Sequence, residues 1–285
     1  MRILVTGADG FTGVHFVAAA RSAGHEVIEF TANLTDPLAV KTQVLSAAPD
    51  AVVHLAAISF VGHSQASAFY DVNVIGTKNL LEALKDLKRA PNRVLLASSA
   101  NIYGNCEQSP ISETQLPAPV NHYAMSKLAM EYLAKNYQTH LPLFFVRPFN
   151  YTGPGQALSF VVPKLVDHFQ RRAPLVELGN LHVEREYNDV RMVCDIYLRM
   201  LTHSEIGATY NICTGQTYTL QHIITALSEL TGHSLQIKVN PMFVRANEIH
   251  RLCGNPEKLI HAIGALPGYA LKDTLKAMLH AASLH

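Results

Sequence analysis

Apolar segments alternate with amphipathic ones through the first half of the chain. Five apolar runs have the length and composition of buried parallel strands, at residues 2–6, 26–30, 51–56, 93–97 and 143–146. Apolar residues at helical spacing fall between them, at about 12–23, 37–48, 66–88 and 122–139. Strands that alternate with helices indicate a parallel sheet with right-handed crossovers. We therefore expect an α/β fold with a doubly wound parallel sheet.

This alternation ends after Pro148. Residues 148–157 are rich in turn formers. Beyond them the pattern predicts helices near 159–172, 192–202, 219–231, 255–263 and 271–282, and strands near 208–213 and 235–239. We expect a first domain over residues 1–150, to which parts of the later chain return. A smaller α/β lobe is expected over residues 151–285.

Composition narrows the function classes. With 285 residues, 48% hydrophobic and 16% charged, the chain is typical of a soluble enzyme, and its net charge of +1 favours neither nucleic acid nor an anionic membrane as a partner. No apolar run reaches 18 residues, and the N-terminus has the pattern of a core strand, so we expect a cytoplasmic protein. Four cysteines without C-x-x-C and fifteen histidines without H-x-x-x-H indicate reduced thiols and no metal site.

A glycine-rich turn follows the first predicted strand. Gly7, Gly10 and Gly13 stand between that strand and the first helical segment. Glycines in this position permit a tight turn and let the backbone approach a pyrophosphate, which the helix N-terminus then binds. The spacing is G-x-x-G-x-x-G rather than G-x-G-x-x-G. The strand–turn–helix context favours a dinucleotide site over an ordinary turn.

A Tyr/Lys pair and two neighbouring serines near the middle of the chain can act together on an alcohol or ketone. Tyr123 and Lys127 are four residues apart, so a helix places them on one face. We expect the ammonium group of Lys127 to lower the pKa of Tyr123 and so to allow proton transfer near neutral pH. Ser98 and Ser99 leave the end of a predicted strand, where the ligand crevice of such a sheet lies.

Taken together, these motifs resemble those of the extended short-chain dehydrogenase/reductases, the nucleotide-sugar epimerases, dehydratases and reductases with a Rossmann-type fold. The matching segments are TGADGFTG at 6–13, HLAA at 54–57, NVIGTKNLL at 73–81, SSANIYG at 98–104, YAMSK at 123–127, RPFNYTGPGQ at 147–156 and REYNDV at 185–190.

The resemblance implies a catalytic triad of Ser99, Tyr123 and Lys127, supported by Asn73. It also implies that the first domain binds NAD(P)H through Gly7, Gly10, Phe11, Thr12, Gly13, Asn33, Leu34, Leu55, Ala56, Ala57, Asn73, Tyr123, Lys127 and Pro148.

The residues after Ser99 limit the reaction type. The 4,6-dehydratases of the family need an Asp/Glu pair there, but this chain has Ala100 and Asn101. Enzymes resembling GDP-fucose synthase place a cysteine where Asn101 stands, and Cys106 is five residues away. Because none of these residues supplies the missing group, we expect simple hydride transfer, either once as in a reductase or twice as in a 4-epimerase.

Three segments of the second half stand out: RPFNYTGPGQALSFVVP at 147–163, GNLHVEREYNDV at 179–190 and VNPMFVRANEIHRLCGNPEKL at 239–259. They resemble segments of GDP-6-deoxy-4-keto-D-mannose reductases. The resemblance implies that Ser99, Asn101 and Asn150 contact the substrate, with Asn150 near its phosphates. It further implies that Asn180 lies near the guanine, that Arg185 pairs with the diphosphate, and that Arg245 and Glu248 bind the phosphate and ribose.

The choice between NADH and NADPH stays open at this stage. Asn33 stands where the family usually has an Asp that contacts adenine. The second strand ends without a carboxylate for a ribose 2′-hydroxyl or an arginine for a 2′-phosphate. Glu29 lies within that strand, so we expect it to point away from the site.

We therefore expect reduction of the C4 ketone of a GDP-4-keto-6-deoxy-hexose by NAD(P)H, giving GDP-D-rhamnose or GDP-6-deoxy-D-talose. A nucleotide-sugar 4-epimerase with tightly bound NAD is the alternative, and a non-catalytic NAD(P)-binding regulator is a remote one. We also expect a homodimer that pairs the helices near 66–88 and 122–139. Their apolar residues could equally belong to the core: Leu80, Leu81, Leu84, Leu128, Met130 and Leu133.

Overall fold

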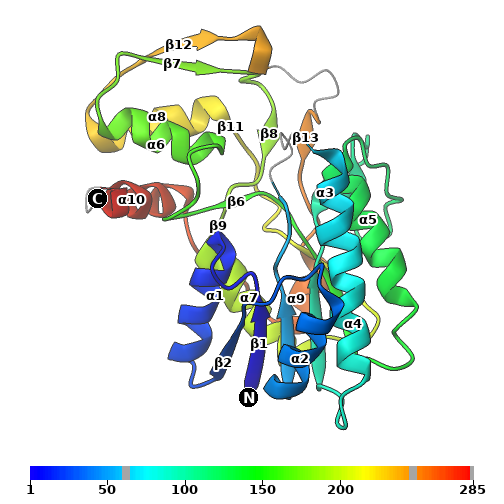
Figure 1. The fold of residues 1–285 in the computed structure, drawn as a ribbon. Helices are drawn as coiled ribbons and strands as arrows, with labels where there is room; N and C mark the ends of the chain where they lie inside the picture. The colour runs from blue at the N-terminus through cyan, green and yellow to red at the C-terminus, as the bar shows by residue number, and fades with distance from the viewer. Residues whose placement is uncertain (60–64, 244–248, 283–285) are drawn as a thin grey trace.

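A six-stranded parallel sheet forms the centre of the computed structural model, which describes residues 1–59, 65–243 and 249–282 (Figure 1). Its strands are β1 (Arg2–Thr6), β2 (Glu26–Phe30), β3 (Ala51–His54), β4 (Arg93–Ala97), β5 (Leu143–Pro148) and β10 (Thr209–Ile212). They follow the spatial order β10-β5-β4-β3-β1-β2, and every neighbouring pair is parallel. The doubly wound parallel sheet predicted from the sequence is confirmed.

Helices cover both faces of this sheet. The first face packs against α1 (Phe11–Ser22), α7 (Val190–His203) and α9 (Glu257–Ile263), and the second against α2 (Pro37–Ala47), α4 (Thr77–Lys85) and α5 (His122–Lys135). Successive residues of β1 alternate between the faces, because Ile3 and Val5 belong to the first core and Leu4 to the second. The strand is buried on both sides, which explains its continuous apolar sequence.

The single helix predicted over residues 66–88 consists of three segments. It begins as α3 (Ala66–Tyr70), continues as a π-helical segment over Asp71–Gly76, and ends as α4. π-Helical turns frequently mark functional sites, and this one contains Asn73. Residues 33–34, which follow β2, lie in a turn before α2.

The second lobe has its own apolar core between helices and short strands. Its elements are β6 (Tyr151–Thr152), α6 (Val161–Gln170), β7 (Leu175–Leu178), β8 (Glu184–Arg185), β9 (Asn188–Asp189), β11 (Tyr218–Thr219), α8 (Leu220–Thr231), β12 (Gln236–Val239), a 3₁₀ turn at Pro241–Phe243, β13 (Arg251–Leu252) and α10 (Leu271–Ala282). The core lies among α6, α8, α10, β7 and β12, grouped above the main sheet in Figure 1.

The two halves of the chain are interwoven. Strand β10 follows five elements of the second lobe in sequence, yet it pairs with β5 at the edge of the main sheet. Helix α7 packs against α1 and supplies much of the core on that face. The main sheet is therefore complete only when residues from the second half of the chain are in place.

The apolar residues that could have formed a dimer contact mostly belong to the core. Leu80, Leu81, Leu84 and Met130 are fully buried, whereas Leu128 and Leu133 are partly buried. Among the described residues, no helix is long and apolar enough to cross a membrane. Likewise, no group of three or more metal-ligating side chains gathers in the described part of the chain.

Candidate active site

The order of the strands reverses between β1 and β3, and two loops come close together at this point. In open α/β sheets ligands bind at such a switch point, outside the carboxyl ends of the strands. Gly7 follows β1 with a φ angle of +66°, and a Cβ atom there would lie 2.8 Å from Ala56 Cα. A Cβ atom on Gly13 would lie 2.0 Å from Gly7 O. Only glycine permits this approach, so the sequence motif corresponds to a cradle of bare backbone.

Helix α1 begins at this cradle without a side-chain cap. Gly10 is the N-cap residue, and no side chain bonds to the first backbone N–H groups of the helix. Such N–H groups and the helix dipole together attract an anionic group. Thr12 Oγ1 lies 2.7 Å from Tyr151 Oη, and the Phe11 ring stacks on Tyr151. The cradle and the free helix terminus fit the pyrophosphate of a dinucleotide.

A cavity of about 370 Å³ extends from the glycine turn to the end of β2. It lies between residues 7–9, residues 29–34, Ala56 and Val72, and so brings together several residues assigned to the cofactor by resemblance. Asn33 is held by its own turn, because its Oδ1 accepts hydrogen bonds from Thr35 N and Oγ1. Glu29 is also among the residues around this cavity, and its carboxylate pairs with Arg21 of α1.

Beneath the cradle, a buried histidine connects two loops. Ala56 N–H donates to Thr6 Oγ1 at 3.2 Å, and Thr6 Oγ1 lies 2.7 Å from His54 Nδ1. His54 Nε2 lies 2.8 Å from Thr77 Oγ1, whose proton is donated to Asn73 O. Because Thr77 can only accept from the histidine, Nε2 carries the proton and Nδ1 accepts one from Thr6. This single tautomer of His54 gives both of its ring nitrogens a hydrogen-bond partner.

The side chain of Asn73 extends this connection to the helix that contains the candidate catalytic tyrosine. Its amide donates to Ser126 Oγ at 2.9 Å and to Ile58 O, and its Oδ1 accepts from Ile58 N. Ser126 in turn donates to Tyr123 O at 2.8 Å. The π-helical segment thereby fixes both the loop after β3 and the first turn of α5.

The buried His54 makes the free energy of unfolding depend on pH. Burial, and secondarily the charge of Lys127, lower the His54 pKa from 6.5 to about 3. Between these two pH values the unfolded chain binds a proton that the folded chain does not, so stability falls as the pH drops, by up to about 1.4 kcal/mol per unit. We expect urea unfolding at pH 7.0 and 5.5 to show this loss. His54→Gln should reduce the loss, whereas exposed His140→Gln should leave it unchanged; an unchanged pH dependence in His54→Gln would contradict the assignment.

The structure brings Ser99 and Tyr123 together at the carboxyl end of β4. Ser99 caps the 3₁₀ turn Ala100–Tyr103, and its Oγ accepts hydrogen bonds from Asn101 N at 3.2 Å and Asn101 Nδ2 at 3.1 Å. A further hydrogen bond joins the Ser99 and Tyr123 hydroxyl groups. Since Ser99 Oγ already accepts two bonds from Asn101, its own proton is available for donation.

Lys127, one turn along α5 from Tyr123, is almost completely buried. Its Nζ donates to Ala97 O at 2.8 Å. Burial lowers its pKa from 10.5 to about 8, although the carboxylate of Glu131 acts in the opposite direction. The expected lowering of the Tyr123 pKa is not seen: burial raises it, and the hydrogen bond from Ser99 only partly offsets the increase. Spacing along a helix does not reveal burial, which dominates here.

A buried ion pair, which the sequence motifs do not identify, lies one turn further along α5. Arg147 donates to both carboxylate oxygens of Glu131, at 2.9 and 2.7 Å, and also to Tyr103 Oη. Tyr103 donates to Asn211 on β10. This network joins α5, β5 and β10, so the helix that contains Tyr123 and Lys127 is fixed to the sheet.

Ser98 adds a candidate ligand contact to the site. Its Oγ is buried and has no hydrogen-bond partner among the described residues. A buried hydroxyl group usually has a partner. At the carboxyl end of β4, a bound ligand can provide one.

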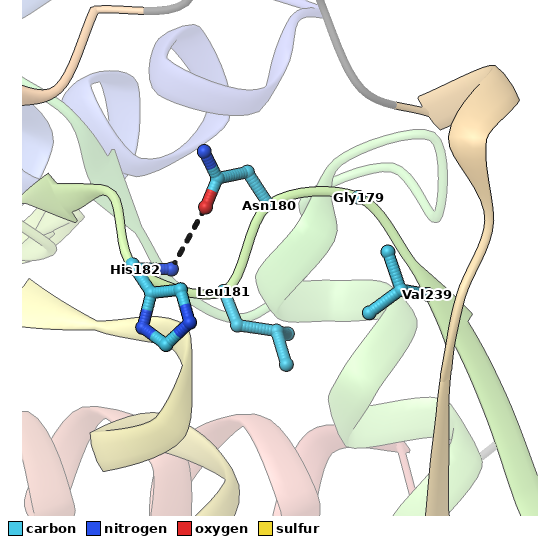
Figure 2. Close-up of a pocket in the computed structure, with 5 residues that line it drawn as sticks. All are labelled: Gly179, Asn180, Leu181, His182 and Val239. Carbon is cyan, nitrogen blue, oxygen red and sulfur yellow. Dashed lines mark hydrogen bonds between the residues drawn. The ribbon is translucent and has the colours of Figure 1, made fainter.

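A second cavity, of about 300 Å³, lies in the second lobe, and Figure 2 shows the side chains around it. Its lining residues are Gly179, Asn180, Leu181, His182 and Val239. Asn180 Oδ1 accepts a hydrogen bond from His182 N at 3.0 Å, which fixes the loop (Figure 2). A Cβ atom on Gly179 would lie 2.4 Å from Phe243 O, so this wall also requires glycine.

The structure describes some of the remaining residues that were assigned to the substrate or the cofactor, but not all of them. Arg185 lies on β8, and its Nη1 donates to two backbone oxygens, Glu184 O at 2.9 Å and His250 O at 3.3 Å. Asn150 is exposed between β5 and β6, and Pro148 ends β5. Arg245 and Glu248 lie outside the described residues.

The chain is similar in sequence and in structure to known enzymes that act on nucleotide sugars. A family model described as GDP-mannose 4,6 dehydratase matches residues 28–278. GDP-6-deoxy-D-talose 4-dehydrogenase of Aggregatibacter actinomycetemcomitans is 40% identical over 269 residues, which cover 93% of this chain and 92% of that protein. GDP-6-deoxy-D-mannose reductase of Pseudomonas aeruginosa is 33% identical over 293 residues, which cover 98% of this chain and 96% of that protein. A solved structure of RMD from Pseudomonas aeruginosa complexed with NADPH superposes with a TM-score of 0.90 at 33% identity, covering 98% of each chain.

Proposed function

The chain belongs to the GDP-mannose 4,6 dehydratase family of extended short-chain dehydrogenase/reductases, and on this basis we propose that it reduces the C4 ketone of a GDP-4-keto-6-deoxy-hexose with NAD(P)H. One observation supports the reduction most directly. Ser99 and Tyr123 share a hydrogen bond at the crevice, and the neighbouring Asn101, which bonds to Ser99, cannot act as an acid or a base. The site can therefore protonate an oxygen but lacks the pair of acids that eliminates water.

Each residue of the triad has a distinct role in this proposal. Bound NAD(P)H would supply the hydride for C4. Ser99 donates its hydroxyl proton as a hydrogen bond to the ketone oxygen, because Asn101 occupies the acceptor side of its Oγ. Tyr123, whose raised pKa keeps Oη protonated at neutral pH, then transfers that proton to the forming alkoxide. The positive charge of Lys127 stabilises the phenolate that remains.

The comparisons support two possible products, which differ at C4. One relative is named for GDP-6-deoxy-D-mannose, which is the same compound as GDP-D-rhamnose, and the other for GDP-6-deoxy-D-talose. We propose that this chain makes one of the two, depending on which face of the ring meets the cofactor. The test is oxidation of NADH or NADPH with freshly prepared GDP-4-keto-6-deoxy-D-mannose, followed by NMR of the product. Absence of oxidation, together with NAD retained through purification and interconversion of 4-hydroxy sugars, would instead establish an epimerase.

The reduction should weaken at alkaline pH. Lys127 has a pKa of about 8 in the folded protein, so its charge is lost as the pH rises through that value. Without the charge, the phenolate of Tyr123 is less stable and the reductive step slows. We expect kcat/KM to be constant between pH 6 and 7 and to fall about tenfold per unit well above pH 8. A profile that stays level to pH 9.5 would exclude Lys127 in this role.

The second cavity is proposed as the subsite for the nucleotide. Asn180 is positioned to contact a base there, and Arg185 lies nearby on β8 in the same lobe. In this arrangement residues 1–150, with the elements that return to them, bind NAD(P)H, and residues 151–285 bind the GDP-sugar. Loss of GDP binding in Asn180→Ala, with dinucleotide binding retained, would support this division.

A homodimer through the face of α3, the π-helical segment and α5 is also proposed. Three apolar side chains are exposed on these elements: Ile75, Met125 and Tyr132. Light scattering of the purified protein and of a Tyr132→Glu variant tests this interface. A monomer at micromolar concentration would exclude it.

The cytoplasm is the proposed location. None of Cys106, Cys194, Cys213 and Cys253 forms a disulfide, and three of the four are buried. Unpaired thiols of this kind are typical of a reducing compartment.

A further inference from the structure

The cavity at the end of β2 contains negative charge and no positive charge on its walls. Asp9 from the glycine turn and Glu29 from β2 both line it. None of the other lining residues, which are described throughout, is Lys, Arg or His. The carboxylate of Asp9 is exposed and has no cationic partner in the described part of the chain.

The position of this cavity identifies the part of the cofactor that would approach it. In dinucleotide-binding folds, an acidic residue about 20 positions after the glycine turn binds the ribose 2′-hydroxyl of NAD, whereas an arginine nearby accommodates the 2′-phosphate of NADP. Glu29 is 19 residues after Gly10, at the carboxyl end of the strand beside β1. The walls at Gly7, Ala8 and Ala56 connect this cavity to the cradle for the pyrophosphate.

One arginine lies near this wall, but its charge is already paired. Arg21, in the last turn of α1, donates from Nη2 to Glu29 Oε1 at 2.8 Å. The pair is exposed, so it is weak in itself, but it keeps the guanidinium group on the carboxylate. A 2′-phosphate would have to compete with Glu29 for this cation.

Two of the backbone N–H groups at the end of β2 are already occupied. The N–H groups of Thr31 and Ala32 both donate to Gln43 Oε1, at 3.1 and 2.8 Å. Gln43 Nε2 donates in turn to Glu29 O. The amide of Gln43 on α2 therefore occupies the two N–H groups that follow the strand.

We propose that Asp9 and Glu29 select NADH over NADPH. The inference rests on the cofactor role in the proposed function and specifies it. A 2′-phosphate adds about 1.5 to 2 negative charges at pH 7, which would face two carboxylates and no free cation. The ribose hydroxyl groups of NADH carry no charge and can donate hydrogen bonds to a carboxylate. The Pseudomonas aeruginosa structure complexed with NADPH shows that a relative accepts the phosphate, so the selection belongs to residues of this chain.

Calorimetric titration of the purified, nucleotide-free protein with NADH and NADPH, without sugar, tests the proposal. We expect NADH to bind at least about tenfold more tightly at low salt, with the ratio shrinking as salt screens the carboxylates. The double variant Asp9→Asn/Glu29→Gln removes both charges and releases Arg21. This variant should bring the dissociation constants of NADH and NADPH to within about threefold of each other, mainly through tighter binding of NADPH.

Glu26→Gln is the matched control. Glu26 lies on the same strand and pairs with an arginine, Arg2, but at the opposite end of β2. The Glu26→Gln variant should leave the ratio of the two dissociation constants unchanged. Thermal unfolding should show that all variants are folded. Equal affinities in the wild type, an unchanged ratio in the double variant, or no binding of either dinucleotide would overturn the proposal. Selective binding of NADH without ketone reduction would support it and overturn the proposed function instead.

Discussion

Replacement of Tyr123 by phenylalanine should lower the turnover of ketone reduction at least about a hundredfold while the fold remains intact. The substitution removes only Oη, the atom that hydrogen-bonds Ser99 and supplies the proton to the alkoxide. The ring stays in place beside Phe69, with centroids 6.3 Å apart. Steady-state turnover with the keto-sugar and saturating NADH or NADPH is the measurement.

A second tyrosine on the same helix provides the control for this variant. Tyr132 is 59% exposed on α5, away from the crevice, so Tyr132→Phe should retain normal turnover. Thermal unfolding of both variants should match the wild type. If Tyr123→Phe turned over at a near-normal rate, another group would have to donate the proton and the proposed mechanism would be wrong.

Replacement of Arg147 by methionine should destabilise the protein by about 3–5 kcal/mol. Arg147 is the bidentate partner of Glu131, whose side chain is almost completely buried. Without the guanidinium group, the carboxylate is left buried without its partner, and Tyr103 Oη loses a donor. The free energy of unfolding in urea at pH 7 is the measurement.

The matching double variant separates the cost of an unpaired charge from the cost of lost packing. Arg147→Met with Glu131→Met replaces both ions by apolar chains of similar length, and such replacements are often nearly neutral. We therefore expect the double variant to be more stable than the single one. A single variant that loses less than about 1 kcal/mol would show that the pair contributes little to positioning α5.

How far the sequence predicts the fold depends on the kind of strand. The strands over residues 2–6, 26–30 and 93–97 were predicted at their observed bounds, because a strand of a doubly covered sheet contains a continuous apolar run. The two-residue strands β6, β8, β9, β11 and β13 are too short to show any periodicity. The π-helical segment has the apolar spacing of an ordinary helix, so the sequence pattern did not reveal it.

For the candidate site, the motifs predicted positions better than environments. Ser99 and Tyr123 share a hydrogen bond and Lys127 binds the end of β4, but the direction of the Tyr123 pKa shift was predicted wrongly, because it depends on burial. His54 stood inside the HLAA motif, and Glu131 stood four residues after Lys127. Each was visible in the sequence, but their partners Thr77 and Arg147 come from other elements, and only the fold brings them together.

The interwoven topology has a consequence for synthesis of the chain. When the first 150 residues have been made, α7 and β10 are still missing, so the apolar face that contains Ile3, Val5 and Phe144 is open to water. Helix α7 is complete only at residue 203, which at about 5–20 residues per second takes a further 3–10 seconds or so. During that interval we expect the exposed apolar face to bind chaperones, and we expect a fragment released at residue 150 to aggregate.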